Sequence, residues 1–123
     1  MKRGLIVLGH GSRDPLWADT LKALRERLHI ALPGTEVEPA YLEFLKPTLA
    51  QCADALWQRG CRDIAVLPVF VAEGVHLRQK LPQLVERARS GREGLAMQLL
   101  PAMGDLPEVQ EGVVRFVQGR LAR

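Results

Sequence analysis

Two runs of consecutive apolar residues dominate the hydrophobic pattern of the chain. The first spans residues 4–9 and lies between two glycines, and the second spans residues 63–71 and is rich in β-branched residues. Uninterrupted apolar runs of this length are typical of strands that are buried on both faces of a sheet. We therefore predict that both runs are central strands of a parallel sheet.

Two further segments have the character of strands. Residues 36–44 look extended, but Pro39 removes one backbone donor from the ladder, which favours a position at the edge of the sheet. Residues 95–100 form a fourth, short apolar segment. The sequence thus predicts four strands, the second of which lies at the margin.

Apolar residues recur at helical spacing between these strands. Asp14 and Pro15 give start signals for a helix that ends near residues 33–34, and Pro47 opens a second helix that stops at Gly60. Two later helices are indicated by the apolar positions Leu81, Leu84, Val85 and Ala88, and by Val109, Val113, Phe116 and Val117.

The alternation of strands and helices predicts an α/β fold, a three-layer sandwich with a four-stranded parallel sheet in the order 2-1-3-4. We treat residues 1–123 as one domain, because no linker-like segment divides them. In this order the chain reverses direction between the first and third strands. Ligands of open α/β sheets bind beyond the carboxyl ends of the strands at such a switch point.

Composition narrows the class of protein. Hydrophobic residues make up 47% and charged residues 25% of the chain, as in ordinary globular proteins, and the net charge of +3 is dispersed, which disfavours nucleic acid as a partner. Cys52 and Cys61 form no metal-binding or disulfide pattern, and Cys52 falls on the apolar face of a predicted helix. We expect a cytoplasmic protein without a membrane anchor.

Each loop at the predicted switch point contains one histidine. His10 follows the first strand and His76 follows the third, whereas His29, late in the first helix, is assigned no role. A lone histidine in a glycine-flanked loop is more often a capping residue than a ligand, but the joint placement favours a shared site. Two imidazoles can hold a divalent ion and leave coordination positions open for a substrate.

Other residues near these loops carry suitable chemistry. Glu43 offers a carboxylate as a third ligand or a proton acceptor, and Ser12 with Arg13 offers donors to a ligand carboxylate. Each of these is about equally well explained as a solvated surface residue. Gly11 is interpreted as a turn residue, and a phosphate-cradling turn with Gly9 is the alternative, although the full glycine-rich motif is absent.

These motifs resemble the small form of the CbiX family of sirohydrochlorin cobaltochelatases, which is related to the SirB ferrochelatases. The resemblance covers nearly the whole chain. It is carried by residues 8–13, 41–43 with Pro47, 68–71, 74–76 and 81–82.

The resemblance implies a class II chelatase fold and a lyase that inserts cobalt, or alternatively iron or nickel, into sirohydrochlorin without a nucleotide, in cobalamin or siroheme biosynthesis. It also implies metal binding by His10 and His76, with Glu43 as a further catalytic residue. Longer relatives contain two such halves, so a homodimer that surrounds the macrocycle is implied for a single half.

The chain departs from the family pattern at two positions. Lys80 stands where family members usually carry an acidic residue, and Glu73 stands where a small residue is common. Lys80 supports a second hypothesis, a non-catalytic metal or tetrapyrrole carrier. A third hypothesis, phosphoryl transfer through His10, lacks the arginine expected immediately before the histidine.

Overall fold

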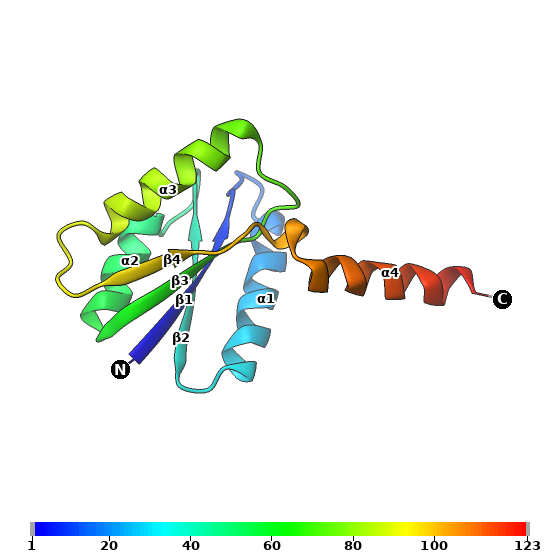
Figure 1. Ribbon diagram of the computed structural model, residues 1–123, viewed down its shortest axis with the longest axis horizontal. Helices are drawn as coiled ribbons and strands as arrows, with labels where there is room; N and C mark the ends of the chain where they lie inside the picture. The colour runs from blue at the N-terminus through cyan, green and yellow to red at the C-terminus, as the bar shows by residue number, and fades with distance from the viewer. Residues whose placement is uncertain (1, 123) are drawn as a thin grey trace.

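A computed structural model describes residues 2–122 of the 123-residue chain. Its four strands pair in parallel, in the order β2-β1-β3-β4, which confirms the predicted sheet (Figure 1). The strands are β1 (Lys2–Gly9), β2 (Thr35–Tyr41), β3 (Cys61–Pro68) and β4 (Ala96–Leu99).

Each strand is followed by a helix. These helices are α1 (Leu16–Ala31), α2 (Leu49–Gln58), α3 (Val75–Arg89) and α4 (Pro107–Leu121), and a short 3-10 helix, η1 (Met103–Asp105), precedes the last of them. Among the described residues, no helix is long and apolar enough to cross a bilayer.

β2 and β3 end earlier than the sequence pattern suggested. β2 stops at Tyr41 rather than at residue 44, because the chain bends through residues 42–46. β3 stops at Pro68 rather than at residue 71, as expected for a residue without a backbone donor. Pro39 lies on the edge strand β2, as predicted, opposite Val7 of β1.

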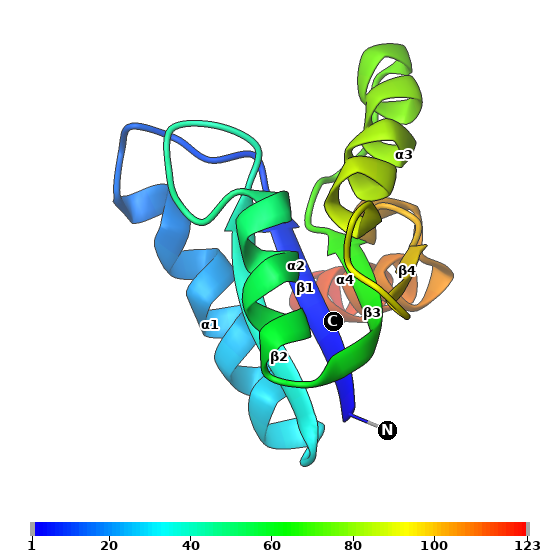
Figure 2. The ribbon, with the colours of Figure 1, turned by 90° about the vertical axis from the view of Figure 1, so that its left-hand side faces the viewer.

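The helices form layers on both faces of the sheet (Figures 1 and 2). α2 and α3 cover one face over a core that includes Ile6, Leu56 and Leu81. α1 covers the other face beside β2 and β1, where Val7 and Leu21 are buried. Cys52 is fully enclosed in the first of these cores, so its interpretation as core filler is confirmed.

The fourth helix departs from the expected packing. α4 forms where the apolar spacing predicted it, but none of its residues is buried, and it projects from the rest of the molecule (Figure 1). The sandwich is therefore closed by three helices instead of four, and one part of the sheet lacks the cover that the fold class predicts.

Candidate functional site

The registry of β1 and β3 determines the position of His10. Leu8 of β1 pairs with Pro68 of β3, and the pairing continues for one hydrogen bond, from the Val69 amide to the Leu8 carbonyl oxygen, at 2.8 Å. Two residues beyond each partner lie His10 and Phe70, whose ring centroids are 4.6 Å apart at an interplanar angle of 38°. Phe70 is buried, so it forms a fixed apolar support for an exposed imidazole.

The segment after β2 supports the same loop from the other side. The Leu42 amide donates to the Gly9 carbonyl oxygen and the Glu43 amide to the His10 carbonyl oxygen, both at 3.0 Å. Gly11 adopts a positive φ of 88°, and a Cβ atom there would lie 1.8 Å from the Glu43 carbonyl oxygen. The predicted turn role of Gly11 is therefore confirmed, and it has a second cause, the close approach of two backbones.

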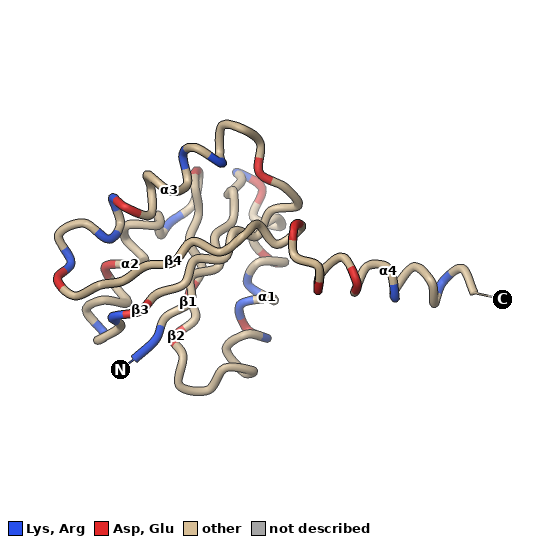
Figure 3. The backbone as a smooth tube through the Cα atoms, in the orientation of Figure 1, with Lys and Arg blue, Asp and Glu red and all other residues tan. Residues whose placement is uncertain are grey.

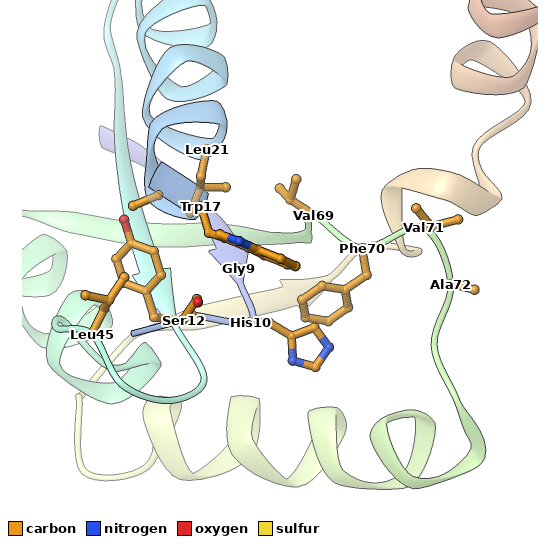
Figure 4. Close-up of a pocket in the computed structure, with 13 residues that line it drawn as sticks. Gly9, His10, Ser12, Trp17, Leu21, Leu45, Val69, Phe70, Val71 and Ala72 are labelled. Carbon is orange, nitrogen blue, oxygen red and sulfur yellow. The ribbon is translucent and has the colours of Figure 1, made fainter. Parts of the chain in front are cut away.

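A pocket of about 320 Å³ opens beside His10, between this loop, the end of β3 and the start of α1 (Figure 4). This volume lies at the lower end of the range usual for small-molecule sites, roughly 300–1,000 Å³. Its wall is largely apolar and includes Trp17, Tyr41, Leu45, Val69, Phe70 and Val71.

Two aromatic residues that line the pocket, Tyr41 and Trp17, were not among the site residues predicted from the sequence. Tyr41 is buried, and this burial raises the pKa of its phenol, which stays protonated at neutral pH. Trp17 is by contrast mostly exposed at the mouth. Phe70 was present in the family motif, yet its contact with His10 follows only from the strand registry.

The other predicted residues take separate positions around the pocket. Ser12 lines it, and the Ser12 hydroxyl accepts a hydrogen bond from the Asp14 amide at 3.1 Å. Arg13 does not line it, because its guanidinium lies over the Phe44 ring, 5.0 Å from the ring centroid. Glu43 is exposed and joins the site through its backbone.

His76 occupies a different hollow. It lies in the first turn of α3, is exposed, and shares a hollow of about 310 Å³ with Lys80, Gln83 and Arg87 on one face of that helix. The structure thus brings His10, Phe70 and the Glu43 backbone together and leaves His76 outside their pocket. The His10 ring points toward the α3 ribbon (Figure 4).

The titratable groups of the described residues form no closed metal cage. Within residues 2–122, no group of three or more His, Cys, Asp or Glu side chains is arranged to hold an ion.

Basic and acidic residues are interspersed along the backbone instead of forming one large region of single sign (Figure 3).

These features define an open α/β protein whose candidate ligand pocket lies beyond the carboxyl ends of its two central parallel strands. The sequence model of the CbiX family matches residues 4–119. The chain belongs to the CbiX family.

Relatives with curated names support this membership. The chain is 35% identical over 81 residues to the sirohydrochlorin cobaltochelatase of Methanocaldococcus jannaschii. The aligned residues cover 66% of this chain and 57% of the relative. It is 33% identical over 82 residues to the Saccharolobus solfataricus protein of the same name, with coverage of 67% and 62%. The matched part thus spans about six tenths of these relatives.

Solved structures share the fold over nearly the whole chain. A CbiX protein from Marinobacter aquaeolei VT8 superimposes with a TM-score of 0.84 at 28% identity, over 97% of both chains. The sirohydrochlorin chelatase SirB from Bacillus subtilis subspecies spizizenii, solved with cobalt, gives 0.81 at 24% identity over 97% of this chain and 51% of SirB. The chain therefore has the fold of one half of SirB.

Proposed function

We propose that the protein is an ATP-independent chelatase that inserts a divalent metal, cobalt in the first place, into sirohydrochlorin. The observation that carries the proposal is the placement of His10, an exposed imidazole supported by buried Phe70 at the switch point of the sheet. Membership of the CbiX family supplies the class of reaction. Iron and nickel are the alternative metals, because imidazole ligands accept all three.

In this mechanism His10, beside its pocket, and His76, in its own hollow on α3, are the metal ligands. The metal is a substrate, and open coordination positions leave room for the pyrrole nitrogens that replace the protein ligands. Insertion of a divalent ion displaces two protons from the macrocycle, so charge is balanced. Glu43 and Glu73 are the carboxylates proposed to accept those protons.

Ser12 and Arg13 are proposed to bind the carboxylates of the tetrapyrrole. Ser12 lines the pocket, and the guanidinium of Arg13 lies over the Phe44 ring. Guanidinium and hydroxyl donors suit carboxylate recognition. Both residues belong to the loop that carries His10, so in this proposal one short segment carries the tetrapyrrole contacts and one of the two metal ligands.

A homodimer is the proposed assembly. The pocket of one copy has a volume of about 320 Å³ and is open to solvent. A planar tetrapyrrole has a wide face, and a single pocket of this size does not enclose it. The chain has the fold of half of SirB, which contains roughly twice as much chain. A second copy supplies the missing half in this proposal.

Insertion by the purified protein tests the proposal. Sirohydrochlorin is mixed with cobalt, iron, nickel or zinc, and the change in absorbance is followed over many equivalents of substrate. We expect multiple turnovers, which His10→Ala and His76→Ala abolish without loss of the fold, whereas His29→Ala on the exposed end of α1 retains them. Undiminished turnover in both variants would exclude this metal site.

A non-catalytic metal or tetrapyrrole carrier is the second candidate. Lys80 beside His76 favours it, because a cation four residues along the helix weakens the binding of a positive ion. In the same absorbance experiment, a carrier saturates at one ligand per site, and this result would replace the chelatase proposal.

A further inference from the structure

We propose that Phe44 is a positioning residue for the substrate. Its ring holds the guanidinium of Arg13 in a fixed orientation and leaves the N–H donors free for a carboxylate on the rim of the tetrapyrrole. This role rests on the proposed function for the identity of the ligand, but it does not depend on the insertion of a metal. Phe44 is neither part of the pocket lining nor one of the site residues predicted from the sequence.

Phe44 holds a backbone conformation that suits glycine. Its φ is 69°, and among residues 2–122 it is the one residue other than glycine with a positive φ. The Leu45 amide donates to the Glu43 carbonyl oxygen at 2.9 Å, so a bond between residues two apart encloses Phe44 in a tight γ-turn. A bulky side chain at positive φ is a steric outlier, and such strain is concentrated at functional sites.

Packing does not explain why phenylalanine occupies this turn. The side chain is 57% exposed and belongs to neither hydrophobic core. The residues on either side of the turn do pack, Leu42 against one core and Leu45 against the other. Glycine at position 44 would allow the same turn without strain and without an exposed apolar ring. The ring is therefore kept for a contact of its own.

That contact is with Arg13. The guanidinium carbon lies 5.0 Å from the centroid of the Phe44 ring. A guanidinium attracted to an aromatic face can keep the N–H donors on its edge available to other groups. None of the ion pairs within residues 2–122 involves Arg13. The ring thus orients a cation that has no carboxylate partner within the described part of the chain.

A second pair of the same kind shows the difference. The guanidinium of Arg62 lies 4.8 Å from the centroid of the Trp57 ring. It also donates to the carbonyl oxygens of Trp57 and Cys61, at 2.7 and 3.0 Å. The donors of Arg62 are therefore used within the fold, whereas those of Arg13 are presented to a ligand.

Backbone contacts hold this pair beside His10. The Glu43 amide donates to the His10 carbonyl oxygen at 3.0 Å, and the Gly11 backbone lies too close to the Glu43 carbonyl oxygen for a Cβ atom. Arg13 follows Gly11 by two residues, and Phe44 directly follows Glu43. The loops after β1 and β2 therefore carry the ring, the guanidinium and the imidazole as one unit.

The position of Arg13 suits the rim of a macrocycle. Arg13 lies outside the lining of the His10 pocket, and that pocket is too small to enclose a tetrapyrrole. The carboxylates of a tetrapyrrole lie on the periphery of the ring, so they extend beyond the pocket when the ring nitrogens are near His10. A guanidinium binds a carboxylate through two parallel hydrogen bonds, and prior orientation by Phe44 reduces the entropy lost on binding.

Binding of metal-free sirohydrochlorin to the whole chain tests the role of the ring. Quenching of tryptophan fluorescence gives the dissociation constant, because Trp17 lines the pocket. Phe44→Leu keeps the turn and an apolar side chain but removes the aromatic face, and it is expected to raise the dissociation constant about two- to fivefold. Phe44→Tyr keeps the aromatic face and is expected to bind as the parent chain does. Equal affinity of Phe44→Leu and the parent chain overturns the proposal.

A double-mutant cycle tests whether Phe44 acts through Arg13. Arg13→Gln is expected to weaken binding at least as much as Phe44→Leu, and Phe44→Leu is expected to add nothing in the Arg13→Gln background. Arg27→Gln removes an exposed charge near the far end of α1 and is expected to leave the affinity unchanged. Losses that simply add in the double variant overturn the positioning role.

Phe44→Gly separates binding from folding. Glycine relieves the strained φ, so the urea midpoint is expected to stay the same or rise, while the affinity falls to that of Phe44→Leu. In the insertion assay this loss is expected in KM for sirohydrochlorin and not in kcat. A urea midpoint that falls together with the affinity assigns the ring to folding and overturns the proposal.

The two proposals fail separately. A parent chain that binds sirohydrochlorin and inserts the metal, with no effect of Phe44→Leu, removes the role of Phe44 and leaves the chelatase standing. A parent chain that shows the coupling between Phe44 and Arg13 but inserts no metal removes the chelatase and leaves the role of Phe44. A parent chain that binds no sirohydrochlorin overturns both.

Discussion

The imidazole of His10 packs on the ring of Phe70, with the centroids 4.6 Å apart. The contact joins the first residue after β1 to the second residue after β3, and the paired residues Leu8 and Pro68 lie two positions before them. An exposed histidine thereby gains a buried support, which restricts its rotamers and orients its nitrogens.

Phe70→Leu is predicted to loosen His10 without unfolding the chain, because leucine keeps an apolar group at the end of β3. The aromatic ring current is lost, so the His10 ring protons should move to a different NMR frequency while those of His29 stay in place. Metal insertion should fall about tenfold, as expected for a less well-oriented ligand. His10 resonances that do not move would contradict the ring contact.

Gly11→Ala is predicted to destabilise the protein more than Gly34→Ala does. Gly34 has the same φ of 88° but nothing within 4 Å of a Cβ atom, whereas a Cβ atom at Gly11 meets the Glu43 carbonyl oxygen. We expect Gly34→Ala to lower the free energy of unfolding by about 1–2 kcal/mol and Gly11→Ala to lower it by at least about 2 kcal/mol more. Urea unfolding measures both, and equal losses would refute the close approach.

Lys80→Glu is predicted to strengthen metal binding at His76. Position 80 lies one helical turn after His76 and lines the same hollow, so the substitution replaces a repulsive charge by an attractive one. The dissociation constant for cobalt, measured by calorimetry, should fall about three- to tenfold. Arg78→Glu makes the same change of charge outside this hollow and should have a smaller effect; equal effects would point to net charge alone.

Alkaline pH is predicted to destabilise the fold through Cys52. Burial raises the pKa of its thiol from 9.0 to about 12, nearby Glu38 adds to this, and Arg59 partly opposes it. Above about pH 9 the unfolded chain loses this proton and the folded chain keeps it, so the stability present below pH 9 falls as the pH rises toward 12. The contribution approaches about 1.4 kcal/mol per pH unit.

The pH dependence of urea unfolding between pH 8 and 11 measures this effect. Cys52→Ala leaves a small cavity and lowers stability at every pH, but its slope above pH 9 should be shallower than that of the parent chain. Burial also raises the pKa of Cys61 and Tyr41, so some slope remains in the variant. Identical slopes would show that Cys52 ionises as freely in the folded chain as in the unfolded one.

The sequence by itself determined the sheet and the location of His10. Uninterrupted apolar runs identify β1 and β3 as central strands, and Pro39 identifies β2 as an edge, because these signals depend only on burial and on a missing backbone donor. The strand order then places His10 at the carboxyl ends of the central strands.

Tertiary structure decided what touches His10 and where α4 goes. The Phe70 contact depends on strand registry, and the approach of Gly11 to Glu43 depends on how two loops lie against each other. His76 follows the correct strand but occupies its own hollow, because α3 begins after a loop that leads away from the His10 pocket. Apolar spacing predicts that α4 is a helix, but the direction in which it leaves the molecule depends on the anchoring of Gly104 to the end of β3, a contact between residues distant in sequence.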